Sequence, residues 1–177
     1  MKTKELVLSA LLLGMGAVLQ AVVPGLVGGM KPDFIPVMMI LSILLFPKLQ
    51  NTLIVGFVAG VLAGLTGMAG AFIPNLIDKV LTALILLGLY TLFAKLLQKT
   101  AVAAIFAFVG TTISGLFFLT FASFLIELPG AVGIMFYSIV LPTAALSAIF
   151  MAVIYPIAKS LHQRTGSVNE VNNTPTV

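Results

Sequence analysis

The sequence has no cysteine, one histidine and very little charge, since charged residues make up only 8% of its 177 positions. Without cysteine, a disulfide framework, a thiolate nucleophile and a Cys-based metal site are excluded. The histidine, His162, follows the last apolar segment, which excludes a His-Glu-x-x-His metalloenzyme and disfavours a Ser-His protease within the membrane. The chain also lacks a Gly-x-x-x-x-Gly-Lys-Ser/Thr phosphate loop, so it is not by itself an ATPase. We therefore expect no enzyme and no cofactor, which leaves binding and translocation.

Hydrophobic residues make up 60% of the chain and the mean hydropathy is +1.22, whereas soluble domains are roughly 45–50% apolar. Apolar segments of helical length recur along almost the whole sequence. The composition therefore predicts an all-α integral membrane domain over residues 1–159, surrounded by the lipid bilayer, and a polar, disordered cytoplasmic tail over 160–177. The net charge of +4 does not indicate a nucleic-acid partner, because the basic residues stand at helix ends, where membrane topology explains them.

Six transmembrane helices are predicted, over residues 6–23, 34–46, 53–68, 74–97, 101–126 and 132–158. The second is short: thirteen residues rise about 20 Å, less than the ~30 Å hydrocarbon core. It therefore needs residues 31–33 near the membrane surface, or it does not span fully. Pro142 lies inside the sixth segment and predicts a kink there.

The basic residues predict the orientation. Six crossings place both termini on one side, and most Lys and Arg residues fall on that side: Lys2, Lys4, Lys48, Lys95, Lys99, Lys159 and Arg164. Lys31 and Lys79 fall on the other side. The positive-inside rule then predicts a multi-pass protein of the cytoplasmic membrane with both termini cytoplasmic.

Small residues form stripes along two of the predicted helices. In the first helix they are spaced four, three and four apart, which creates one face that another helix can approach closely: Ala10, Gly14, Ala17 and Ala21. In the third helix, Gly56, Gly60 and Gly64 form a doubled Gly-x-x-x-Gly. This second stripe is interpreted either as tight packing within the monomer or as a surface for a partner.

Charge gathers where the second, fourth and sixth helices begin on the outer side. Each entry carries a proline and a nearby acid, and acids near helix N-termini also complement the helix dipole. The combination of both charge signs with an amide nevertheless suits a zwitterionic or carboxylate-bearing solute, with aromatic side chains as an apolar wall. The candidate substrate-binding residues are Lys31, Asp33, Phe34, Asn75, Asp78, Lys79, Glu127 and Tyr137.

Several motifs carry a resemblance to a known family. Gly28-Gly-Met-Lys-Pro-Asp33, Leu44-Leu-Phe-Pro47 and Pro74-Asn-x-Ile-Asp-Lys79 resemble the tryptophan transporter family of Gram-positive bacteria, often called TrpP. In size, helix number and the small residues of its first helix, the chain resembles the S components of energy-coupling factor (ECF) transporters. The resemblance implies high-affinity uptake of tryptophan, captured near the outer face under the loop at residues 28–33.

The ECF resemblance also implies a partner, a coupling module of a transmembrane protein and ATPases. The docking motif of S components, Ala-x-x-x-Ala, corresponds here to Ala10-x-x-x-Gly14, with a strict copy only at Ala17-x-x-x-Ala21. Transport by an ion gradient is the alternative. Two other functions stay open from the sequence: an S component for a vitamin or flat-ring precursor, and a non-transporting scaffold or regulatory subunit.

Overall fold

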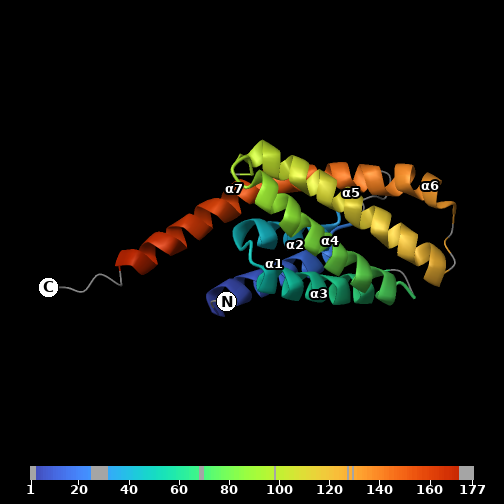
Figure 1. The fold of residues 1–177 in the computed structure, drawn as a ribbon, viewed down its shortest axis with the longest axis horizontal. Helices are drawn as coiled ribbons and strands as arrows, with labels where there is room; N and C mark the ends of the chain where they lie inside the picture. The colour runs from blue at the N-terminus through green and yellow to red at the C-terminus, as the bar shows by residue number, and fades with distance from the viewer. Residues whose placement is uncertain are drawn as a thin grey trace.

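In the computed structural model of this chain, the described residues are 3–24, 32–67, 70–97, 99–126, 128 and 130–171, with side chains described as far as residue 161. All regular elements in these ranges are helical, which confirms the predicted all-α bundle (Figure 1). The elements are α1 (Thr3–Val22), α2 (Phe34–Leu45), α3 (Leu49–Thr66), α4 (Phe72–Phe93), α5 (Thr100–Leu125), α6 (Val132–Met135), the π-helix η1 (Phe136–Val140) and α7 (Leu141–Val171).

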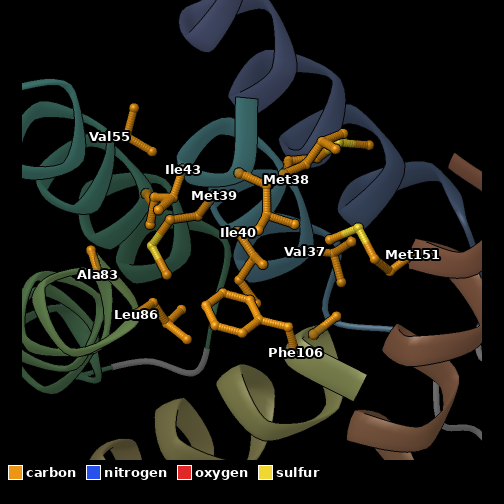
Figure 2. Close-up of a cluster of buried hydrophobic side chains, with 14 of the residues drawn as sticks. Val37, Met38, Met39, Ile40, Ile43, Val55, Ala83, Leu86, Phe106 and Met151 are labelled. Carbon is orange, nitrogen blue, oxygen red and sulfur yellow. The ribbon is translucent and has the colours of Figure 1, made fainter. Parts of the chain in front are cut away.

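The short helix α2 lies at the centre of the bundle. It contacts α1, α3, α4, α5 and α7, and every residue from Phe34 to Leu44 is buried. Figure 2 shows its side chains packed against those of the surrounding helices, among them Leu86, Phe106 and Met151. Burial on all sides explains why this segment is apolar all round rather than amphipathic.

Five helical segments are long and apolar enough to cross a membrane: Thr3–Val22, Leu49–Thr66, Phe72–Phe93, Thr100–Leu125 and Val132–Leu161. The twelve residues of α2 rise only about 18 Å and fall short of the hydrocarbon core. The predicted shortness of the second helix is therefore confirmed. The bundle consists of five long helical segments around one short one.

The glycine stripe of α3 packs against α4. A Cβ atom on Gly60 would lie 2.8 Å from Cα of Leu76, and one on Gly64 would lie 2.7 Å from the ring of Phe72. The two backbones therefore approach too closely for any side chain between them. Of the two interpretations of this stripe, packing within the monomer is confirmed, and the stripe is not open to a partner.

Helix α1 presents its small-residue stripe outward. Its buried residues are Ser9, Leu13 and Gly16, and a Cβ on Gly16 would lie 3.0 Å from Cγ of Met38. On the other face, a Cβ on Gly14 would meet nothing within 4 Å. The predicted stripe is thus separate from the face that packs on α2, and most of it is exposed: Ala10, Gly14 and Ala21 are exposed and Ala17 is half-buried.

The sixth crossing differs in detail from its prediction. Its irregularity is the π-helix η1, in which Leu141 N–H donates to the carbonyl of Phe136, five residues back, immediately before Pro142. At the other end, α7 continues to Val171 and so passes the boundary predicted at residue 160. Residues 172–177 lie outside the described ranges, and the division into domain and tail stays a prediction.

Figure 1 shows how the connections are distributed along the bundle. The N-terminus and the α2–α3 and α4–α5 connections lie at one end, and the α3–α4 and α5–α6 connections lie at the other. At the first end, the Tyr155 hydroxyl of α7 donates a hydrogen bond to the carbonyl of Leu97, 2.9 Å away, just after α4. We call the other end, where α2 and α4 begin, the entry end.

Candidate functional site

A cavity of about 240 Å³ lies at the entry end of the bundle. It is lined by the C-terminal part of α1, the start of α2, the end of α3, the start of α4, the middle of α5 and the junction of η1 with α7. Its lining residues are Gln20, Asp33, Ile35, Ala63, Thr66, Gly67, Asn75, Lys79, Thr111, Ser114, Gly115, Phe118, Ile139, Val140 and Thr143. Typical ligand pockets measure roughly 300–1,000 Å³. This cavity is slightly smaller than that range, so its size suits a small solute.

A buried ion pair forms one wall of this cavity. Lys79 and Asp78 pair directly, with side chains 3% and 0% exposed. Lys79 Nζ also donates to Ser114 Oγ at 2.8 Å, and Ser114 Oγ donates to the Asp78 carboxylate at 2.9 Å. Two of the three Lys79 N–H donors are thus used in this network, and one donor remains.

The position of this pair corrects the sequence prediction, which placed Asp78 and Lys79 at the membrane surface. Lys79 lies seven residues into α4, about 10 Å from its start. Thr82, one turn further on, donates to the other oxygen of the Asp78 carboxylate at 2.9 Å. Charges at this depth are costly unless they pair or bind something, so the pair indicates function more strongly than a surface pair would.

The start of α2 brings a second carboxylate to the cavity. Asp33 is half-buried and lines the cavity, and its carboxylate interacts electrostatically with Lys79. Two neighbouring helices hold the backbone here: Asp33 N–H donates to Ser147 Oγ of α7 at 3.1 Å, and Phe34 N–H donates to Gln20 Oε1 of α1 at 3.0 Å. The first free N–H groups of α2 are therefore bonded to α1 and α7.

Asn75 completes the polar part of the cavity. Its side chain is buried, and Nδ2 donates at 2.9 Å to the carbonyl of Ala71, the residue just before α4. The cavity therefore brings together three of the candidate residues, Asp33, Asn75 and Lys79, with Asp78 directly behind Lys79.

Other candidate residues lie elsewhere. Phe34 is 3% exposed and packs edge-on against the ring of Phe150, with ring centroids 4.9 Å apart. Tyr137 is 72% exposed and stacks edge-on with Phe136. Neither lines the cavity. Lys31 and Glu127 lie outside the described residues.

Sequence reasoning missed the contributions of α1, α5 and α7. Gln20, Thr111, Ser114 and Thr143 all line the cavity. The available signal was the isolated polar residue inside an apolar span, such as the amide at position 20, because a membrane helix carries polar groups at depth mainly where they face the bundle interior. The apolar wall is likewise not made of the predicted aromatics but of Ile35, Phe118, Ile139 and Val140.

The chain is similar to known proteins over nearly its whole length. Residues 2–162 match the family described as "Tryptophan transporter TrpP". The chain is 43% identical over 166 residues to a "Probable tryptophan transport protein" of Bacillus subtilis (strain 168), covering 93% of this chain and 96% of that protein. The chain belongs to the tryptophan transporter family TrpP. The TrpP resemblance of its motifs is thereby confirmed.

Two further TrpP relatives carry the same name, "Probable tryptophan transport protein". The protein from Clostridium acetobutylicum is 35% identical over 90% of this chain and 94% of its own length. The protein from Clostridium perfringens is 31% identical over 92% of this chain and 94% of its own length. No solved structure matches the chain.

Membership of the TrpP family decides between the function classes left open by the sequence. The family is one of transporters and not of enzymes, which confirms the predicted class. Together with five helical segments that are long and apolar enough to cross a membrane, it makes this chain a multi-pass membrane transporter. A scaffold that uses the α3 stripe for a partner is contradicted, because α4 covers that stripe.

Proposed function

We propose that this chain takes up tryptophan with high affinity across the cytoplasmic membrane, and that it captures the amino acid in the cavity at the entry end. The observation that carries the proposal is the presence of both charge signs, Asp33 and Lys79, in one cavity that also has an apolar wall. The charge distribution supports the orientation: most basic residues belong to the end opposite the cavity, which the positive-inside rule makes cytoplasmic.

Each part of an amino-acid zwitterion then has a partner. The third N–H of Lys79 donates a hydrogen bond to the carboxylate of the amino acid. The side-chain oxygens of Asp33 and Asn75 accept hydrogen bonds from its ammonium group. Asp78 holds the Lys79 side chain in place. The indole occupies the apolar part beside Ile35 and Val140. Lys31 and Glu127, which lie outside the described residues, are also proposed to contribute to substrate binding.

Binding is tested by adding tryptophan to the detergent-solubilised protein and measuring the melting temperature. A ligand at 100 times its dissociation constant stabilises the native state by about 2.7 kcal/mol, so the melting temperature is expected to rise. Tryptamine, which lacks the carboxylate, and indole-3-propionate, which lacks the ammonium group, are each expected to bind at least about tenfold more weakly. A rise with a vitamin such as biotin or a thiamine precursor, and none with tryptophan, contradicts the proposal.

We further propose an S-component-like mode of transport, in which the exposed stripe of α1 docks on an ECF coupling module whose ATPases drive release inward. The supporting observation is the outward position of Ala10, Gly14 and Ala21, which the fold of the monomer leaves uncovered. Docking through such a stripe relies on close backbone approach. A side chain added there would hold the two proteins apart without touching the cavity.

Gly14→Leu is therefore expected to reduce tryptophan uptake by cells at least about tenfold, while the purified protein keeps its tryptophan-induced rise in melting temperature. Gly88→Leu is the matched control, because a Cβ on Gly88 of α4 also meets nothing within 4 Å. Normal uptake by the Gly14 variant, or by cells that lack the coupling module, would contradict docking and favour transport driven by an ion gradient, with Asp78 or Glu127 as proton carrier.

A further inference from the structure

Thr111 presents a buried hydroxyl that has no hydrogen-bond partner. The residue is 3% exposed, lies in the middle of α5 and lines the cavity, and its Oγ makes no hydrogen bond. Threonine within a helix usually bonds the carbonyl one turn back. Its neighbours on the same helix do so: Thr112 Oγ donates to the carbonyl of Phe108, and Thr120 Oγ to that of Leu116, both at 2.8 Å.

The place of this hydroxyl in the cavity indicates what it meets. Three other cavity residues of α5 follow Thr111 at intervals of three, four and seven positions: Ser114, Gly115 and Phe118. This spacing places all four residues on one face of α5. Ser114 belongs to the polar wall through its bonds with Lys79 and Asp78. Thr111 is one turn deeper than Ser114, about 4.5 Å further from the entry end. A ligand whose charged groups lie at Lys79 therefore reaches Thr111 with its side chain.

Several other polar groups on this cavity already make hydrogen bonds within the protein. The Thr66 hydroxyl donates to the carbonyl of Leu62, and Ser114 belongs to the ion-pair network. The proposed role of Asp33 and Asn75 is to bind the ammonium group. An indole ring carries one N–H, which is a donor only and needs an acceptor once it is buried. Among the described residues, Thr111 Oγ1 is the fully buried side-chain oxygen of the cavity that makes no hydrogen bond.

We propose that Thr111 Oγ accepts a hydrogen bond from the ring N–H of the bound amino acid and so selects an indole over rings that lack this donor. The inference rests on the proposed function and adds to it the residue that determines specificity. A site built to accept such a bond discriminates strongly against an analogue without the donor, because the protein group is then left buried and unpaired.

The test compares tryptophan with 3-benzothienylalanine, an amino acid of nearly the same shape in which sulfur replaces the ring N–H. The protein itself contains no tryptophan, so the indole fluorescence of the bound ligand is measured without background from the chain. The wild type is expected to bind tryptophan at least about tenfold more tightly than the sulfur analogue, measured by calorimetry. Thr111→Val should remove that difference by weakening tryptophan alone, and should shift the emission of the bound indole.

Thr112→Val is the matched control, because the adjacent hydroxyl bonds only the backbone of its own helix. It is expected to leave both affinities within about twofold of the wild type. The inference is overturned if Thr111→Val keeps the discrimination, if it weakens both ligands equally through packing, or if the wild type binds both ligands alike because water occupies the hydroxyl. Failure of the wild type to bind either ligand would instead overturn the proposed function, so the two failures are distinguishable.

Discussion

Lys79→Met is expected to abolish tryptophan binding and to destabilise the protein by about 3–5 kcal/mol, because it leaves the Asp78 carboxylate buried without its partner. Asp78 is 0% exposed, and water cannot solvate the charge that remains. Hydrogen bonds from Ser114 and Thr82 remain but do not neutralise it. The measurements are thermal unfolding of the detergent-solubilised protein and calorimetry with tryptophan.

The double variant Asp78→Asn with Lys79→Met separates stability from binding. Replacing both members of a buried ion pair by neutral groups of similar volume is often nearly neutral for stability. The double variant is therefore expected to recover most of the lost melting temperature and still fail to bind tryptophan, because the group that receives the carboxylate is gone. Tryptophan binding by the double variant at wild-type affinity would show that Lys79 does not contact the ligand.

Gly60→Leu is expected to destabilise the bundle by at least about 1–3 kcal/mol, the usual range for overpacking. The added Cβ would lie 2.8 Å from Cα of Leu76, which is backbone and cannot rotate away as a flexible side chain can. Helix α4 must then move away from α3, and it carries Asn75 and Lys79 out of the cavity wall. Both the melting temperature and the affinity for tryptophan are expected to fall.

The matched control for this change is again Gly88→Leu, on a face of α4 with open space around it. It adds the same side chain to a membrane helix without a clash and is expected to leave both measurements close to those of the wild type. If Gly60→Leu behaves like Gly88→Leu, the close approach of α3 and α4 does not position the cavity.

The sequence was sufficient to predict the helices, because long apolar segments punctuated by proline and charge have few other interpretations in a membrane. It also indicated the short central helix through its length alone. The continuation of α7 beyond residue 160 was missed, because that segment is polar and shows no apolar periodicity. A helix that already exists extends at little cost, since nucleation and not propagation is the unfavourable step.

The site was predictable only in part, and the reason is geometric. Neighbours such as Asp78 and Lys79 normally point to different faces of a helix, so their spacing does not predict a pair. In the folded chain they nevertheless pair, and Ser114 of α5, 36 residues from Asp78 in the sequence, bonds both. Which polar residue of an apolar helix faces inward depends on the rotation of that helix, and packing decides that rotation. Thr111 and Thr112 are adjacent, and the sequence alone does not tell which one lines the cavity.

Gln20 connects the cavity to the exposed face of α1. Its side chain borders the cavity and also holds the first turn of α2. Gly14 lies six residues earlier in α1, about 9 Å along the helix axis, and is exposed on the outer surface of the protein. A solute that contacts Gln20 would therefore touch the same helix on which the proposed coupling module docks, so the docking affinity of the loaded protein would differ from that of the empty protein under that proposal.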